Sequence, residues 1–179
     1  MNKRNEQLQA MSFEQLHARS VEFHGHSCPG LIIGIKAAMY VMELFHEAFS
    51  EDEEFVCVAE NDACGVDAIQ ALTGCTIGKE NLIFQMQGKN AFSFYRRSDG
   101  TSFRLVLRAT PEKSKEERLA WLMDGDYHEM FDVKPVPGPV PEAARIFKSC
   151  TCSVCGERFA ENFAHLQDGE IVCSGCFRP

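Results

Sequence analysis

The chain is 179 residues long, with 26 acidic side chains, 18 basic side chains and a formal net charge of −8 at pH 7. This length fits one domain, or one domain with a small appendage, and 45% hydrophobic with 25% charged residues is an ordinary globular composition. The acidic balance excludes a general nucleic-acid binder, because binding phosphates needs a clustered excess of Lys and Arg.

Nothing in the sequence predicts a membrane segment. The longest apolar stretch, residues 30–45, is interrupted by Lys36 and is short for a bilayer-spanning helix. The N-terminus has a charged start with no apolar segment behind it, so it is not typical of a signal peptide. We therefore expect a cytoplasmic protein with reduced thiols. Its nine cysteines then indicate metal ligands or reactive thiols rather than disulfides.

Hydrophobic periodicity, turns and caps predict the elements in chain order. Helices are predicted over residues 6–20, from Pro29 to about Phe49, over 63–72 and from Pro111 to about Gly125. Strands are predicted over residues 55–59, 81–87, 91–97 and 101–108. Asn61 and Asp62 are good N-cap residues for the third helix, and Gly74 is its expected C-cap. A strand–helix–strand unit followed by a hairpin predicts a mixed sheet packed by helices, in an α+β or α/β architecture.

The chain is expected to contain two domains and a linker. Residues 1–131 form the predicted α+β core. Residues 132–141 hold four of the seven prolines and are expected to be a semi-rigid linker, because proline favours an extended backbone. Residues 142–179 are too few to build an ordinary hydrophobic core unaided.

Two C-x-x-C pairs lie in the C-terminal segment: Cys152 with Cys155, and Cys173 with Cys176. Four thiolates complete the tetrahedral shell of a closed structural zinc site, and metal binding would supply the folding free energy that this segment lacks. A redox dithiol is the alternative for a single pair, and four thiolates also hold iron, as in rubredoxin. We predict zinc. The segment's near-neutral charge argues against a DNA-reading finger and favours a structural or protein-contact module.

The stretch FHGHSCPG at residues 23–30 contains two histidines and a cysteine, which are metal-binding or reactive residue types, close together. In an extended segment His24, His26 and Cys28 point to the same side, so two imidazoles and a thiol can converge. Cys28 would be the N-cap of the helix that begins at Pro29. The unpaired N–H groups and the helix dipole there favour a thiolate. Such a cluster is either a soft metal site or a nucleophile with a base.

A second cluster, residues 61–67, repeats this arrangement after a buried strand. Cys64 lies in the first turn of the predicted helix, with Asp62 and Asp67 beside it as candidate bases. The end of such a strand is where ligand sites form in layered folds. The predicted metal or catalytic site draws on His24, His26, Cys28, Cys64, Asp62 and Asp67.

The remaining cysteines and histidines receive other roles. Cys57 is expected in the core, and Cys75 could line the same cleft as Cys64. Cys150 is expected to be a spectator, with substitution for Cys152 in the zinc shell as the alternative. Surface or packing roles are expected for His17, His46, His128 and His165.

Three motifs resemble the FmdE family, named for the FmdE component of molybdenum formylmethanofuran dehydrogenase. They are Phe-His-Gly-His-x-Cys-Pro-Gly at 23–30, Asn-Asp-x-Cys-x-x-Asp-Ala-Ile-Gln at 61–70 and Thr-Gly-Cys-Thr-x-Gly-Lys-x-Asn-Leu at 73–82. The resemblance covers roughly residues 10–130. It implies a thioredoxin-like mixed sheet and a metal-binding active site at His24, His26, Cys28 and Cys64, with Asp62, Asp67 and Cys75 nearby. Two-domain members carry a treble-clef zinc finger, which matches residues 142–179.

Three hypotheses follow. The first is a zinc-dependent or thiol-dependent enzyme or accessory protein, in which the core binds a second divalent metal, zinc, and leaves a position open for water or substrate. The second is a non-catalytic subunit or metallochaperone that handles molybdenum, tungsten or zinc for a partner oxidoreductase, with the zinc finger as the protein contact. The third is a thiol redox protein in which Cys28 and Cys64 pair across space. No membrane partner is expected, and a homo-oligomer is left open.

Overall fold

The computed structural model describes residues 3–46, 49–109, 114–136 and 138–179. The chain divides into two compact units, residues 1–143 and 144–179, which we call the core unit and the finger unit. No helix in the part of the chain that the structure describes has the length and apolar character needed to cross a membrane.

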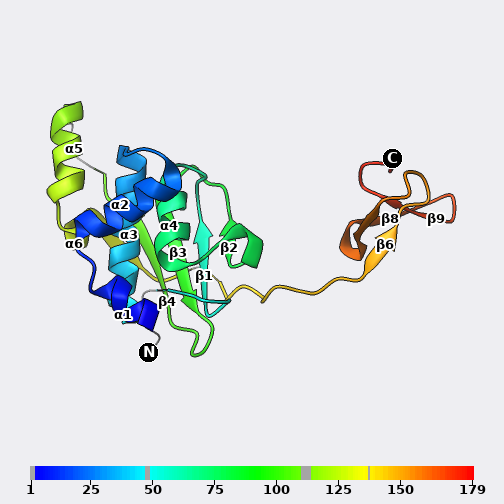
Figure 1. Ribbon diagram of the computed structural model, residues 1–179, viewed down its shortest axis with the longest axis horizontal. Coiled ribbons are helices and arrows are strands. Elements are labelled where there is room, and N and C mark those ends of the chain that lie inside the picture. Colours follow the sequence, from blue (N-terminus) through cyan, green and yellow to red (C-terminus); the bar gives the residue numbers. More distant parts are fainter. Residues whose placement is uncertain (1–2, 47–48, 110–113, 137) are drawn as a thin grey trace. The chain divides into compact units, whose positions relative to one another are not determined.

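The core unit is a mixed five-stranded sheet packed by helices (Figure 1). Its helices are α1 (Lys3–Gln9), α2 (Phe13–His24), α3 (Pro29–Phe45), α4 (Gly65–Thr73), α5 (Lys115–Asp124) and α6 (Tyr127–Met130), with a 3-10 turn η1 (Ile77–Lys79). Its strands are β1 (Phe55–Ala59), β2 (Leu82–Phe84), β3 (Ala91–Arg96), β4 (Ser102–Leu107) and β5 (Phe131–Lys134). The order is β2-β1-β3-β4-β5, with β1 and β2 parallel and the other neighbours antiparallel. The predicted mixed sheet and α+β class are confirmed.

Helix α3 is the central element of the hydrophobic core. Residues 31–38 are all buried, and they pack with α4 and with one face of the sheet. Lys36 is buried within this run. Its ammonium group donates to the Gly125 carbonyl oxygen at 2.8 Å and lies 4.3 Å from the centre of the Phe13 ring. A charge at this position is tolerated because it has both a hydrogen-bond acceptor and an aromatic face.

The other face of the sheet is covered by the segment that follows β5. Val56, Val58 and Tyr95 are buried there, and Val136 and Val140 pack against them. The prediction of a linker over residues 132–141 is therefore wrong for its first part, since residues 132–134 pair with β4 and the valines beyond them bury apolar surface.

The predicted helix over residues 6–20 is two helices, α1 and α2. Ser12 interrupts it because its hydroxyl accepts from the Gln15 N–H, while the Gln15 side chain accepts from the Ser12 N–H. This capping box starts a new helix. The Ser12 and Gln15 pair is visible in the sequence, but the apolar spacing on both sides of it suggests one continuous helix.

Other boundaries differ from the prediction for local reasons. Helix α3 begins at Pro29 with Cys28 as its N-cap, as predicted, but it ends at Phe45 because His46 adopts a left-handed conformation with φ 55°. Asn61 and Asp62 are not the N-cap of α4; Cys64 is. The Asn61 side chain instead accepts from the Ala63 N–H and donates to the Lys89 carbonyl oxygen.

The short elements differ most from the prediction. The strand predicted over residues 81–87 is only β2, and α6, β5 and η1 were not predicted. Helix α5 is capped by Ser114 and Glu117 in a second capping box, while its predicted start at Pro111 lies outside the described residues. Elements of three or four residues carry too little periodicity to be recognised from the sequence.

The finger unit consists of two hairpins and a 3-10 turn. The hairpins are β6 (Ser149–Thr151) with β7 (Arg158–Ala160) and β8 (Ala164–Gln167) with β9 (Glu170–Cys173), and the turn is η2 (Glu161–Phe163). Of the hydrophobic residues described in this unit, those that are buried are Cys152 and Val172. Such a small apolar core cannot stabilise the unit by itself.

Helices α3 and α4 touch backbone to backbone. A Cβ atom added at Gly34 would lie 2.1 Å from the Gly65 carbonyl oxygen, and one added at Gly65 would lie 2.9 Å from the Gly30 carbonyl oxygen. No real Cβ tolerates such contacts, so glycine is required on both helices. This contact fixes how closely the two N-termini approach.

We predict that Gly34→Ala destabilises the chain by about 1–3 kcal/mol or more, because the added methyl group forces α3 and α4 apart. Urea unfolding followed by circular dichroism measures the change. Gly78→Ala is the matched control, since a Cβ at Gly78 meets nothing within 4 Å. Equal urea midpoints of unfolding for the two variants would contradict the assignment of a close contact between α3 and α4.

Candidate functional site

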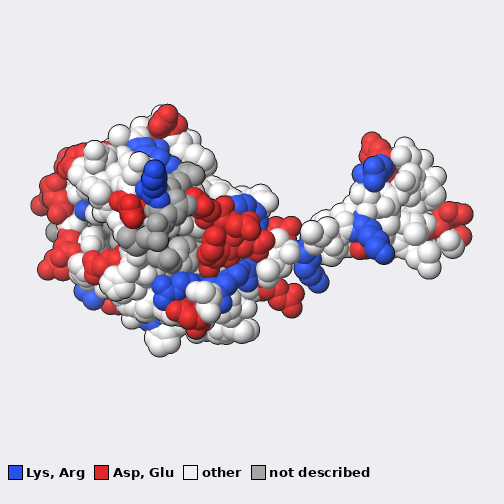
Figure 2. All heavy atoms as spheres, turned by 60° about the horizontal axis from the view of Figure 1, so that its bottom comes forward, with Lys and Arg blue, Asp and Glu red and all other residues white. Residues whose placement is uncertain are grey.

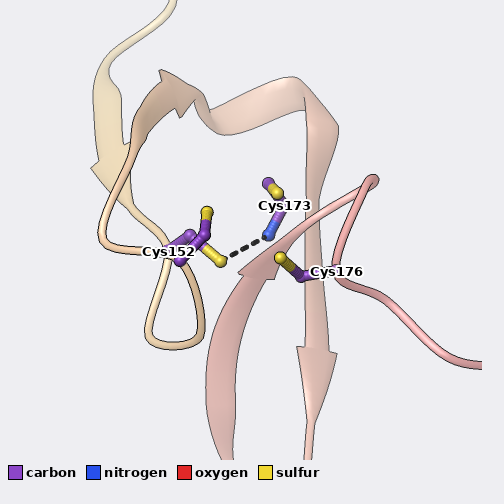
Figure 3. Close-up of side chains that lie close together, drawn as sticks. Cys152, Cys173 and Cys176 are labelled. Carbon is purple, nitrogen blue, oxygen red and sulfur yellow. Dashed lines mark hydrogen bonds between the residues drawn. The ribbon is translucent and has the colours of Figure 1, made fainter.

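The four cysteines of the two C-x-x-C pairs converge in the finger unit. Their sulfur atoms, those of Cys152, Cys155, Cys173 and Cys176, lie within 4.8 Å of one another. Figure 3 shows three of these side chains gathered beside the β8–β9 hairpin. The main chain builds each knuckle: the Gly156 N–H donates to the Cys152 carbonyl oxygen, and the Cys176 N–H donates to the Cys173 carbonyl oxygen. This arrangement supports the predicted binding of a metal ion by the four cysteines.

The pKa values of the finger cysteines favour a bound cation. Main-chain N–H groups of Cys155 and Cys173 hydrogen-bond to the Cys152 sulfur and lower its pKa to about 6. Hydrogen bonds with the thiols of Cys155 and Cys173 raise the pKa of Cys176 to about 12. Cys152 therefore forms a thiolate readily, whereas Cys176 resists ionisation without a compensating charge. A divalent ion removes that penalty, because coordinating thiols are deprotonated by the metal.

Zinc fits this donor set. Four sulfurs at a zinc–sulfur distance of about 2.3 Å stand about 3.8 Å apart in a tetrahedron, which is compatible with the observed spread. Cys150 and His165 lie outside the four-sulfur group. His165 instead stacks on Phe177, with ring centres 4.3 Å apart, and contacts the Ser174 hydroxyl at 3.1 Å.

The motif at residues 23–30 also brings its side chains together. One ligand atom from each of His24, His26 and Cys28 lies within 4.8 Å of the others. His24 Nε2 is 3.9 Å from the Cys28 sulfur, and the two imidazole centres are 4.5 Å apart. His24 and Cys28 are half-buried, whereas His26 is exposed.

The expected reason for this convergence is wrong, although the convergence itself is observed. The segment is not extended, because His24 is the last residue of α2. Gly25 then reverses the chain with φ 97°, a conformation that favours glycine. The reversal folds His26 back onto His24, and Cys28 follows as the N-cap of α3, where its sulfur accepts from the Leu31 N–H at 3.4 Å.

Asp67 orients His24. Its Oδ2 atom lies 2.7 Å from His24 Nδ1, and the Gln70 side chain donates to Oδ1 at 3.3 Å. A carboxylate on Nδ1 holds the proton on that nitrogen and leaves the Nε2 lone pair, 3.9 Å from the Cys28 sulfur, available to a metal ion. Asp67 was predicted as a candidate base; its contact makes it the partner of His24. Gln70 was not predicted, although it lies one helical turn from Asp67.

Cys64 approaches this group from the start of α4. Its Cβ lies 3.3 Å from the position that a Cβ at Gly30 would take, so the side chain rests against the first turn of α3. A hydrogen bond with the Cys28 thiol, followed by burial, raises the pKa of Cys64. The Cys64 side chain therefore lies beside Cys28, although Cys64 is not part of the group of three ligand atoms within 4.8 Å of one another.

The two other residues predicted at this cleft differ in burial. Asp62 is exposed on the loop before Cys64. Cys75 does not line the cleft: it is fully buried in the hydrophobic core with Cys57, and burial raises its pKa to about 11. Its Gly-rich neighbourhood suggests an open loop, but the side chain points into the core.

Figure 2 shows one face of the core unit on which acidic side chains gather in a patch, with basic side chains along one side of it. A surface of this kind repels a polyanion.

Three comparisons relate these observations to known proteins. The chain matches the family model described as FmdE, molybdenum formylmethanofuran dehydrogenase operon, over residues 23–134. A probable S-adenosyl-L-methionine-binding protein of Archaeoglobus fulgidus is 30% identical over 197 aligned positions, covering 91% of this chain; the chain spans 53% of that relative's length. A crystal structure of a tungsten formylmethanofuran dehydrogenase FmdE-like protein from Syntrophus aciditrophicus superimposes with a TM-score of 0.69 at 26% identity, covering 98% of this chain and 96% of that one.

We predict that Cys176→Ser lowers the zinc content of the chain by one ion and exposes the finger unit to trypsin, because three sulfurs leave the shell incomplete. Elemental analysis and limited proteolysis measure the two effects. Cys150→Ser is the control and retains the ion. Loss of the ion in the Cys150→Ser protein, or its retention in the Cys176→Ser protein, would contradict the assignment of the shell.

Proposed function

The chain belongs to the FmdE family, and from that membership and the geometry of its core we propose that it is a zinc-dependent enzyme or accessory subunit of formylmethanofuran dehydrogenase-type metabolism. The finger unit would hold a structural zinc ion. The core unit would hold a second divalent ion, zinc, on His24, His26 and Cys28. The observation that carries the proposal is the convergence of these three ligands with His24 oriented by Asp67.

Three protein ligands are the pattern of a catalytic rather than a structural zinc site, because a position remains for water or substrate. A bound zinc ion would act there as a Lewis acid on a substrate carbonyl and would activate water. The exposed side chain of His26 leaves one side of the site accessible. Asp67 is engaged with His24, so the exposed carboxylate of Asp62 is the base we propose.

The protein partner is part of the proposal. The family description and the Syntrophus aciditrophicus relative both refer to formylmethanofuran dehydrogenase, which favours an oxidoreductase subunit as the partner. The finger unit would provide the contact, since Leu166 and Ile171 are exposed apolar residues opposite each other on its β8–β9 hairpin. The S-adenosyl-L-methionine ligand of the archaeal relative is not part of our proposal, because the chain spans only about half of that protein.

A metallochaperone is the second candidate, and the exposure of His26 favours it. An ion held by an exposed imidazole can pass to another protein more readily than one held by buried ligands. A core ion that resists a chelator would support the enzyme, and rapid transfer to a partner would support delivery.

The finer fold names also belong to the proposal. The order of β1, α4, β2, β3 and β4 supports a thioredoxin-like sheet. Two zinc knuckles with two hairpins support a treble-clef finger.

We predict that the full chain binds two zinc ions and that the His24→Ala/His26→Ala variant binds one, because only the core ion loses its ligands. Elemental analysis after dialysis measures the ratio. His46→Asn is the control: this histidine is exposed and its left-handed conformation suits asparagine. One zinc ion per chain in the unsubstituted protein, or two zinc ions per chain in the double variant, would contradict the proposal.

Asp67→Asn is expected to weaken core zinc binding about 10-fold to 100-fold, since it removes the carboxylate that orients His24. Competition with a chromophoric chelator gives the two dissociation constants. The same measurement on Asp62→Asn should return the value of the unsubstituted chain, because Asp62 touches none of the three ligands in our assignment. Equal affinities for Asp67→Asn and the unsubstituted chain would remove Asp67 from the site.

A further inference from the structure

The two cysteines of the candidate site share one structural position on two different helices. Cys28 is the N-cap of α3 and Cys64 is the N-cap of α4. The glycine contact between these helices holds the N-caps side by side, and the Cys64 sulfur lies 3.9 Å from the position that a Cβ at Gly30 would take. Although they are far apart in the chain, the two thiols lie close enough for Cys28 to raise the pKa of Cys64.

We propose that Cys28 and Cys64 are a reversible redox switch on the core metal site: as thiols they allow the ion to bind, and as a disulfide they exclude it. This proposal rests on the proposed function, because it regulates that site. The oxidant is a small-molecule disulfide. A Cys28 thiolate attacks one of its sulfurs and expels a thiolate; the Cys64 thiolate then attacks the mixed disulfide, expels the second and forms the Cys28–Cys64 bond.

The overall reaction is balanced. Two protein thiols lose two electrons and two protons, and the small-molecule disulfide gains them and becomes two thiols. A sulfur bonded to another sulfur is no longer a thiolate ligand, so Cys28 leaves the metal site on oxidation. His24 and His26 alone are a weak site for zinc, which structural and catalytic centres hold with three or four ligands.

The other cysteines of the core unit cannot take this role. Cys57 and Cys75 are fully buried, and burial raises the pKa of each thiol. Cys28 and Cys64 are both partly exposed, so an oxidant in solution can reach them. Reactive thiols are accessible ones, whereas buried structural thiols are inert.

Metal binding and oxidation are then linked. If the disulfide lowers zinc affinity by some factor, zinc protects the dithiol against oxidation by that same factor. Each tenfold preference of zinc for the dithiol raises the midpoint potential of the pair by about 30 mV. We expect the zinc-loaded chain to require at least a tenfold more oxidising glutathione ratio than the zinc-free core for half-oxidation.

The test exposes the zinc-loaded full chain to glutathione buffers of increasing oxidised fraction. A chromophoric chelator counts the released zinc, and mass spectrometry of alkylated, non-reduced peptides identifies the disulfide. We expect one ion to be released together with the appearance of a Cys28–Cys64 peptide pair, at a ratio that leaves the finger ion bound. Dithiothreitol with added zinc should restore two ions per chain.

Two variants separate the switch from general oxidation. Cys64→Ser retains the three ligands but cannot close the bond, so its core ion should stay bound in the buffer that empties the unsubstituted chain. Cys150→Ser should behave like the unsubstituted chain. The absence of a Cys28–Cys64 peptide pair, or equal release from Cys64→Ser, would overturn the proposal. A reduced chain that holds only the finger ion would instead refute the proposed function, while the peptide map would still report whether the two cysteines pair.

Discussion

The backbone contact between α3 and α4 is the constraint on which the candidate site depends. Each helix has a cysteine as its N-cap, and glycine at positions 30, 34 and 65 lets the helices approach until no side chain fits between them. Any larger residue would separate the two N-termini and the two sulfurs with them. The packing of the core and the geometry of the site therefore depend on the same contact. The approach of α3 and α4 that packs the core also brings Cys28 and Cys64 together.

The four finger cysteines and the core group of His24, His26 and Cys28 are assembled in opposite ways. In the finger unit each C-x-x-C pair lies on one tight turn. The local sequence of each turn therefore places two of the four sulfur atoms. In the core unit the ligands come from the end of α2, the turn after it and the start of α3, and Asp67 reaches His24 from α4 at 2.7 Å. The finger unit has a very small hydrophobic core, so metal binding would supply folding free energy there, whereas the core unit has its own hydrophobic interior.

The sequence predicted what local spacing determines. Cys28 as an N-cap, Pro29 as the first helical residue and the four finger cysteines all follow from neighbours within a few positions. The Asp67–His24 contact, the burial of Cys75 and the strand β5 could not be predicted, because each depends on a partner far along the chain. His24 shows the limit most clearly: its convergence with Cys28 was predicted for an extended segment, but a helix end and a left-handed Gly25 produce it.

The most direct test of the account is a crystal structure of the full chain grown with zinc, with anomalous diffraction recorded on both sides of the zinc absorption edge. We predict two zinc peaks per chain, one among the sulfurs of Cys152, Cys155, Cys173 and Cys176 and one bounded by His24 Nε2, His26 and the Cys28 sulfur. A single peak in the finger unit, with none at the core ligands, would contradict the central claim.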